Sequence, residues 1–144
     1  MRTVASFMIV LAVLGSIGCA SNSSVSTSIG AAANRGPGTR IALAEHAAFA
    51  WVRVCIFGPY TPDDKIDAVT GISGAAARAY DIRSNDGIDV LMFLDQSRIV
   101  DSVAHSRGRA DFGPELVGRC YSRDRAVFAV RTPPSNSWGN IGPS

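Results

Sequence analysis

Histidine and aspartate are the residues of this chain that most readily suggest proton-transfer chemistry. The sequence holds only two histidines, His46 and His105. His105 could act as a base if Asp101 or Asp111 oriented its ring. However, residues four apart in an extended strand lie about 13 Å apart, so Asp101 and His105 would not pair directly. We therefore expect His105 to be a polar residue at the end of a strand, and we expect no catalytic residue.

A group of three aspartates, Asp63, Asp64 and Asp67, could suggest a carboxylate pair. Thr61 can cap a helix, and Pro62 suits the first helical position. Asp63 and Asp64 would then lie in the first turn, where carboxylates stabilise the positive end of the helix dipole. We therefore predict that they help to start a helix. The chain has no phosphate-binding glycine loop and no metal-ligand spacing, so we expect no cofactor and no metal.

Arginine supplies nearly all the positive charge, because Lys65 is the only lysine. The formal net charge is +2, and no basic stripe suggests a nucleic-acid partner. Several arginines fall in the expected last loops, where they could bind an anionic ligand or a partner. The alternative is a solvated rim. Trp138 could dock on the domain or on a partner. The candidate ligand or partner residues are Arg107, Arg109, Arg119, Arg123, Arg125 and Trp138.

The N-terminal segment has the features of an export signal. Arg2 precedes an apolar run over residues 4–14, and the small residues Gly15, Ser16 and Gly18 follow it. This pattern is typical of a secretory signal peptide. The apolar run is too short for a membrane-spanning helix, which needs about 20 residues.

The segment Ser16-Ile17-Gly18-Cys19 resembles the lipobox of bacterial lipoproteins, although the family usually has Leu where Ser16 stands. The resemblance implies a lipoprotein signal peptide over residues 1–18 and a Cys19 that carries acyl chains such as palmitate. Ala20 and Ser21 follow in place of the Asp that favours retention in the inner membrane. The implied location is therefore the outer membrane, facing the periplasm. The alternative is cleavage after Ala20 and secretion to the periplasm.

Two cysteines, Cys55 and Cys120, remain after Cys19 is set aside. An even pair in an oxidising periplasm is most simply a disulfide. Such a link would stabilise the fold by about 4 kcal/mol on chain-entropy arguments. Two independent buried thiols are the alternative.

The composition divides the chain into four parts. Residues 19–39 and 132–144 are rich in small and polar residues, so we expect a flexible tether and a disordered tail. Residues 40–131 form the expected globular domain. Residues 41–49 fit either a short helix or a strand followed by a helical turn.

The rest of the domain follows a clearer pattern. Residues 51–57 indicate a central strand. The expected helix ends at Gly71, and residues 74–80 add a second helical turn. Residues 88–94 and 98–105 indicate a hairpin, with Ile99 and Val103 on one face, and residues 125–131 form a last strand. This order predicts an α+β fold, a small antiparallel sheet of about four strands with a helix packed on one face.

Three segments carry a resemblance to a family of small uncharacterised bacterial envelope lipoproteins. The first is a strand that begins at Trp51 and ends in Phe57-Gly58-Pro59-Tyr60-Thr61, before a capped helix. The others are Asp86-Gly87-Ile88-Asp89-Val90-Leu91-Met92-Phe93 and Gly118–Phe128. This chain differs from the family at two positions: the family often has Asp where Val52 stands and Tyr where Cys55 stands. The resemblance implies a fold but no activity.

These observations favour a non-enzymatic, lipid-anchored envelope protein that binds another envelope protein. One alternative is a periplasmic small-ligand binder that uses the arginine-rich loops. Another is a hydrolase built around His105. A membrane, reached through the lipid anchor, and an envelope protein are thus the expected partners.

Overall fold

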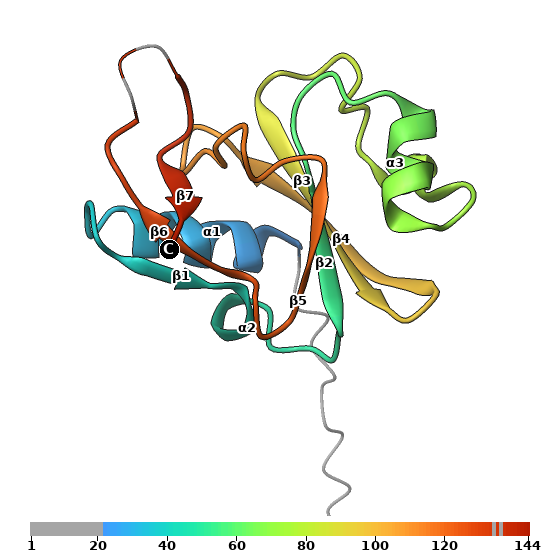
Figure 1. The fold of residues 1–144 in the computed structure, drawn as a ribbon, viewed down its shortest axis with the longest axis horizontal. Coiled ribbons are helices and arrows are strands. Elements are labelled where there is room, and N and C mark those ends of the chain that lie inside the picture. Colours follow the sequence, from blue (N-terminus) through green and yellow to red (C-terminus); the bar gives the residue numbers. More distant parts are fainter. Residues whose placement is uncertain (1–21, 134, 136) are drawn as a thin grey trace, which may run out of the picture.

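The computed structural model describes residues 22–133, 135 and 137–144. Two antiparallel sheets, one of four strands and one of three, pack with helices, which confirms the α+β class (Figure 1). The elements are α1 (Asn22–Ala33), β1 (Arg40–Ala42), α2 (Leu43–His46), β2 (Arg53–Phe57), α3 (Asp63–Thr70), the 3-10 helix η1 (Ala75–Arg78), β3 (Ile88–Asp95), β4 (Arg98–Ser106), β5 (Arg119–Ser122), β6 (Val127–Val130) and β7 (Ile141–Pro143).

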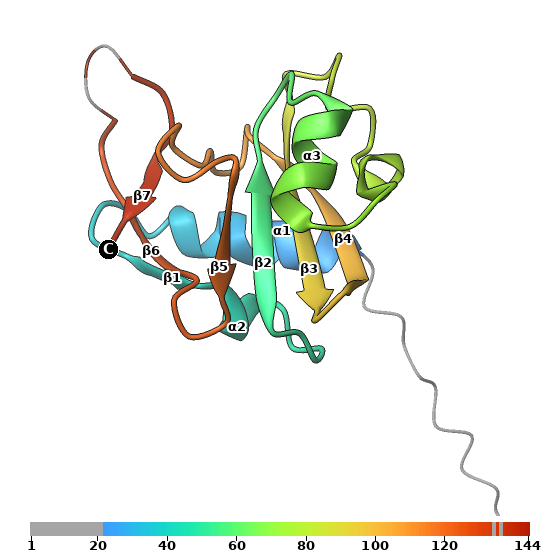
Figure 2. The ribbon, with the colours of Figure 1, turned by 45° about the vertical axis from the view of Figure 1, so that its right-hand side comes forward.

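The four-stranded sheet is the centre of the molecule, with the strand order β4-β3-β2-β5. Along β2, Val54 and Ile56 belong to one apolar cluster, whereas Cys55 and Phe57 belong to another. Side chains alternate between the two faces of a strand, so both faces of this sheet are buried. Figure 2 shows α1 behind the strands and α3 in front of them. The prediction of a helix on one face only was therefore incomplete.

Helix α3 and η1 cover one face of this sheet. Ile66 of α3 is fully buried there, and Gly71 ends the helix in the left-handed conformation, with φ of 71°. The prediction that Thr61 caps the helix is wrong. Pro62 takes the N-cap position, and Thr61 Oγ1 donates to the Gly58 carbonyl oxygen at 2.6 Å.

Helix α1 occupies most of the segment predicted to be a tether, and that prediction is wrong for residues 22–33. Val25, Ile29, Ala32 and Ala33 are buried in the cluster on the other face of the central sheet. They lie at positions i, i+4, i+7 and i+8, which is one face of a helix. Packing on the sheet rather than strong helix propensity therefore stabilises α1.

The second sheet has the order β1-β6-β7 and extends the same cluster. Its last strand corrects the prediction of a disordered tail over residues 132–144, because β7 pairs with β6 from Ile141 to Pro143. Ile141 is fully buried. Residues 41–49 form β1 followed by α2, the second of the two predicted alternatives.

The predicted hairpin is present as β3 and β4, but a bulge changes its faces. The register shifts between Phe93 and Leu94, so that Phe93 pairs with Asp101 and Leu94 pairs with Ile99. Ile99 therefore packs on the α3 side and Val103 on the α1 side, contrary to the predicted common face.

The lipid-anchor prediction at Cys19, with its signal peptide, lies outside the described residues. Within the described part of the chain, no helix is long and apolar enough to span a bilayer.

Candidate functional site

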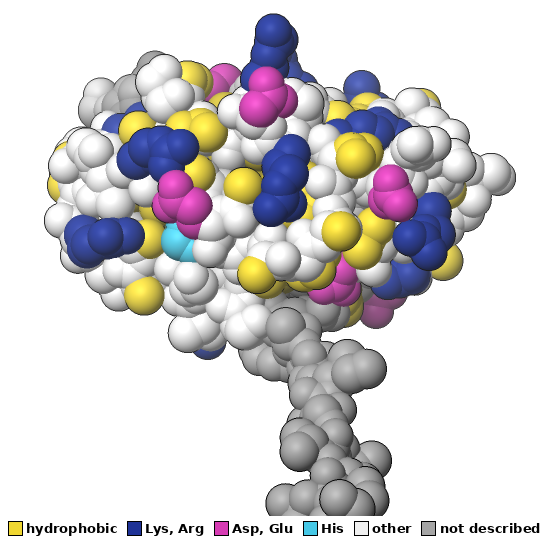
Figure 3. All heavy atoms as spheres, turned by 90° about the horizontal axis from the view of Figure 1, so that it is seen from below, with side chains coloured by type: hydrophobic (Ala, Val, Ile, Leu, Met, Phe, Trp, Pro, Cys, Tyr) yellow, Lys and Arg dark blue, Asp and Glu magenta, His cyan; other side chains and the backbone are white. Residues whose placement is uncertain are grey.

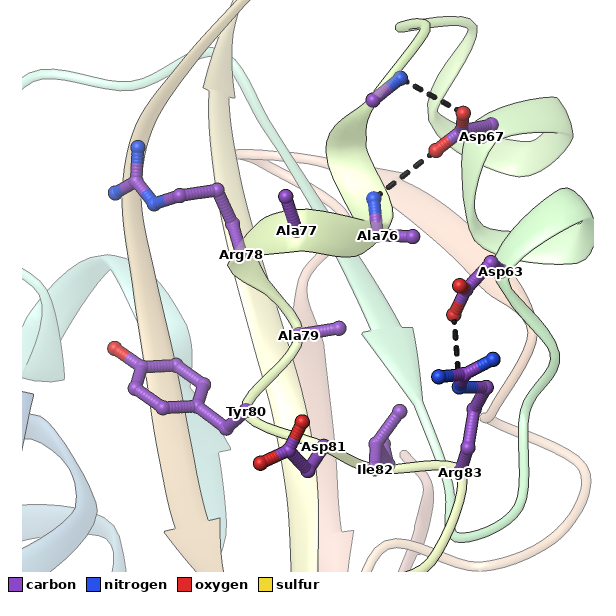
Figure 4. A pocket seen from close by; sticks show the side chains of 11 residues that line it. Asp63, Asp67, Ala76, Ala77, Arg78, Ala79, Tyr80, Asp81, Ile82 and Arg83 are labelled. Carbon is purple, nitrogen blue, oxygen red and sulfur yellow. Dashed lines mark hydrogen bonds and ion pairs between the residues drawn. The ribbon is translucent and has the colours of Figure 1, made fainter.

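A pocket with a volume of about 670 Å³ lies between α3 and the segment that joins η1 to β3. We call it the Tyr80 pocket. Asp63 and Arg83 face each other there as an ion pair at 3.3 Å (Figure 4). Its lining comprises Asp63, Asp67, Gly74, Ala76, Ala77, Arg78, Ala79, Tyr80, Asp81, Ile82 and Arg83.

An exposed tyrosine in left-handed backbone, Tyr80, lines this pocket, and a second one, Tyr60, is hydrogen-bonded to the lining. Tyr80 and Asp81 have φ of 53° and 55°, and Tyr60 has φ of 63°. The Tyr60 N–H donates to the Ile82 carbonyl oxygen at 2.8 Å, which holds Tyr60 beside the pocket lining. The side chains of Tyr60 and Tyr80 are 63% and 42% exposed. Left-handed backbone at such residues costs about 1–2 kcal/mol each, and such strain is concentrated at functional sites.

Hydrogen bonds from two elements hold the pocket wall in place. The Asp67 carboxylate accepts the backbone N–H groups of Gly74 and Ala76, at 2.7 and 3.0 Å (Figure 4). These bonds lower the pKa of Asp67. On the other side, buried Ser102 donates to the Arg78 carbonyl oxygen, and the Tyr80 hydroxyl donates to the Ser102 carbonyl oxygen. Asp67 therefore organises the loop, which gives the predicted aspartate group a structural role.

His105 lies in a buried polar cluster beneath α1. Its Nε2–H donates to the Ala110 carbonyl oxygen at 2.7 Å, so Nδ1 accepts from the Ser26 hydroxyl at 3.0 Å. Burial lowers the pKa of His105 to about 4, although the bond to Ala110 opposes this effect. Neither predicted acid orients the ring, because Asp101 accepts the Ser102 N–H and Asp111 pairs with an arginine.

The second histidine also binds a serine of α1. His46 Nδ1 lies 2.7 Å from the Ser28 hydroxyl. Partial burial lowers the pKa of His46, and the neighbouring Glu45 opposes that shift. Helix α1 is thus fixed to the domain by polar contacts to both histidines as well as by its apolar face.

Asp89 is a buried carboxyl that the sequence analysis did not single out. Its Oδ2 accepts the Phe112 N–H at 3.1 Å, while Oδ1 has no donor among the described residues. Burial raises the pKa of Asp89 to about 7, the Phe112 bond opposes this, and the charge and hydrogen-bonding of Asp111 raise it further. The available signal was an acidic residue near the start of a mostly apolar strand, β3, whose other acidic residue, Asp95, stands at its end.

Asp111 links this cluster to the C-terminal segment. The Arg107 guanidinium binds the Asp111 carboxylate at 2.6 and 3.0 Å, and the Asp111 N–H donates to Asn140 Oδ1 at 2.7 Å. Arg107 also stacks on Trp138, 4.7 Å from its ring centroid. Trp138 thus contacts the domain, one of its two predicted roles, and it remains 41% exposed.

The five predicted arginines do not form one cluster. Arg107 lies on Asp111, Arg109 donates to Thr27 Oγ1 at 3.0 Å, and Arg123 stacks on Trp51 at 4.7 Å. The face viewed in Figure 3 likewise shows basic side chains spread over the surface, with acidic, hydrophobic and other side chains between them.

The remaining two arginines, Arg119 and Arg125, share one smaller pocket of about 340 Å³.

The predicted cysteine pair is a disulfide. Cys55 of β2 lies directly opposite Cys120 of β5 in the antiparallel register, and their sulfurs are bonded. Among the described residues, no group of three His, Cys, Asp or Glu side chains is placed to hold a metal ion.

Comparison with known proteins returns no matching family model, no matching curated protein and no matching solved structure.

Proposed function

We propose that this chain is a non-enzymatic, lipid-anchored bacterial envelope protein that binds another envelope protein through the Tyr80 pocket. The observation that carries the proposal is the pair of exposed tyrosines, Tyr60 and Tyr80, on strained but firmly held backbone at the Tyr80 pocket. Tyrosine is enriched among the residues that dominate protein-binding interfaces. Rigid backbone also reduces the entropy lost on binding.

The position of α1 bears on how such an anchor would act. Only Ala20 and Ser21 separate Cys19 from the first residue of α1, Asn22. Three extended peptide units span at most about 11 Å. An acylated Cys19 would therefore hold the domain close to the bilayer surface rather than on a long tether.

Burial of the Ser26–His105 pair supports a non-enzymatic function over the hydrolase alternative. Ser26 is 2% exposed and His105 is fully buried. A nucleophile and its base must reach a substrate, and neither side chain lines a described pocket. Their hydrogen bond instead secures α1.

The test is site-specific photo-crosslinking in intact cell envelopes. A photoreactive residue at Tyr60 should give a discrete product with one envelope protein, whereas the same residue at exposed Val52 should not. The partner, once purified, should bind the full chain, and Tyr60→Ser should weaken that binding about tenfold, a typical loss for an interface anchor. Val52→Ser is the matched control. Identical products from both positions, or unchanged affinity of Tyr60→Ser, would refute the proposal.

A further inference from the structure

A second pocket lies where the two sheets diverge, and we call it the inter-sheet groove. Strand β5 belongs to the four-stranded sheet and β6 to the three-stranded sheet, and the chain turns between them (Figure 2). The groove has a volume of about 340 Å³, near the lower limit for small-molecule sites. Its lining includes Leu116, Arg119, Tyr121, Arg125, Val127 and Phe128, together with the carboxylate-bearing Glu115.

The floor of the groove is apolar and continuous with the core. Leu116 and Phe128 are 4% and 2% exposed, and both belong to the cluster that contains α1. Val127 adds a partly buried aliphatic side chain. An apolar body placed in the groove would therefore pack against core side chains and cover the surface that the partly buried Val127 still exposes, which is favourable.

The walls of the groove are held in place before any ligand binds. The Tyr121 hydroxyl donates to the Leu116 carbonyl oxygen at 2.9 Å, and the Tyr121 ring packs edge-on against Phe128 at 5.1 Å. Gly118, with φ of 72°, makes the turn into β5 and donates its N–H to Ile56 at 2.7 Å. Such preorganisation reduces the entropy cost of binding.

Two guanidinium groups line the groove without a partner. Within the described part of the chain, Arg119 and Arg125 form no ion pair, and their side chains make no hydrogen bond. Of the carboxylates near them, Glu115 pairs with Arg131 at 2.5 Å, and Asp124 is an exposed carboxylate whose charge acts on Arg125 without an ion pair. Arginine binds carboxylates in a planar, two-point geometry.

From this combination we infer that the inter-sheet groove binds a small organic carboxylate with an apolar body, such as a medium-chain fatty acid. The chain would pack on Leu116 and Phe128, and the carboxylate would bind Arg119 and Arg125. The inference goes beyond the proposed function, since the groove and the Tyr80 pocket share no lining residue. The proposed function and this inference can therefore be refuted independently of each other.

Isothermal titration of the purified full chain with sodium octanoate tests the inference. We expect saturable binding of octanoate, at least tenfold weaker binding of 1-octanol and octylammonium, and no measurable binding of acetate. Arg119→Gln and Arg125→Gln should each weaken octanoate binding about tenfold, the usual effect of losing a charged hydrogen bond. Arg98→Gln, an exposed arginine on the β3–β4 hairpin, is the matched control and should bind as the wild type does.

A further substitution, Val127→Thr, tests the apolar contacts of the groove. Val127→Thr keeps the shape of the side chain but adds a hydroxyl, and it should weaken octanoate binding without changing the melting temperature by more than a few degrees. Absence of saturable octanoate binding, equal binding of octanol, or equal losses in Arg98→Gln and Arg119→Gln would overturn the inference.

Discussion

Asp89 gives the sharpest quantitative prediction, because a fully buried carboxyl in an apolar strand must make stability depend on pH. The substitution Asp89→Asn keeps an oxygen that can accept the Phe112 N–H. Its amide can also donate toward Asp111, as only the protonated form of Asp89 can. The variant therefore mimics the neutral side chain at every pH.

The magnitude follows from the two pKa values of Asp89. The folded-state pKa of about 7 lies above the ordinary value of 3.8. The folded protein thus binds more protons than the unfolded chain between these values, and stability falls as pH rises through this window. Each unit of difference between the two pKa values corresponds to 1.36 kcal/mol. The full loss of unfolding free energy, reached above pH 7, is therefore about 4 kcal/mol. Asp89→Asn should therefore exceed the wild type by that amount at pH 8 and match it near pH 4.

His105 acts in the opposite direction over nearly the same window. Its pKa is lowered from 6.5 to about 4, so the unfolded chain binds more protons there. Stability from His105 is complete above pH 6.5 and is lost as pH falls toward 4, by about 3 kcal/mol. In the wild type the contributions of Asp89 and His105 nearly cancel between pH 4 and 6.5. In the Asp89→Asn variant the contribution of Asp89 is absent, so the unfolding free energy should rise visibly with pH between pH 4 and 6.5 because of His105.

Urea unfolding followed by circular dichroism at pH 4.5, 6, 7 and 8 measures these differences. Asp95→Asn is the control, since its carboxyl is exposed on the hairpin and its removal should change stability by less than about 1 kcal/mol at every pH. A constant difference between Asp89→Asn and the wild type across this range would refute the assignment of a neutral buried Asp89.

Three further predictions concern the disulfide, α1 and the Tyr80 pocket. Replacing Cys55 and Cys120 together by Ser should lower the unfolding free energy by about 4 kcal/mol, measured by urea unfolding against the reduced wild type, which should show the same loss. Ser26→Ala leaves buried His105 Nδ1 without its donor, so stability should fall by about 1–3 kcal/mol; unchanged stability would argue against this bond. Asp81→Gly relieves left-handed strain and should raise the melting temperature by a few degrees; a lower melting temperature would contradict that strain.

Three strands of the central sheet, β2, β3 and β4, could be predicted because they carry strong local patterns. The predicted last strand, residues 125–131, instead forms β6 of the other sheet, and the residue pattern did not indicate β5. The segment that became β2 is rich in β-branched and aromatic residues, and it lies between other strands as expected. The hairpin of β3 and β4 was predictable for the same reason. Its faces were not, because the bulge beside Phe93 inserts one residue and reverses the alternation beyond it.

The elements that the sequence analysis missed are those that depend on distant contacts. Helix α1 consists mainly of small residues, and only the spacing of Val25, Ile29, Ala32 and Ala33 could have indicated it. Strand β7 has three residues and exists because β6 supplies its hydrogen bonds. The local composition of both segments predicts flexible chain, whereas contacts with distant parts of the fold stabilise a helix and a strand there.

The candidate site shows the same limit. The aspartates in the first turn of α3 were recognisable as helix-start residues. The segment around Tyr80 and Asp81, in contrast, carries no local signal that it lies beside that helix. The dispersal of the arginines was equally invisible, since Arg107, Arg109 and Arg123 each depend on a partner far away in the sequence or on a folded loop. Only Arg119 and Arg125 share a pocket.

The central proposal, a lipid-anchored envelope protein, is tested most directly at Cys19. Cells that express the wild type or Cys19→Ser would be labelled with a fatty-acid analogue, and their membrane and soluble fractions compared. We predict a labelled wild type in the membrane fraction and an unlabelled Cys19→Ser variant in the soluble fraction, because two or more acyl chains give stable anchoring. Equal labelling and equal membrane association of the two proteins would contradict the account.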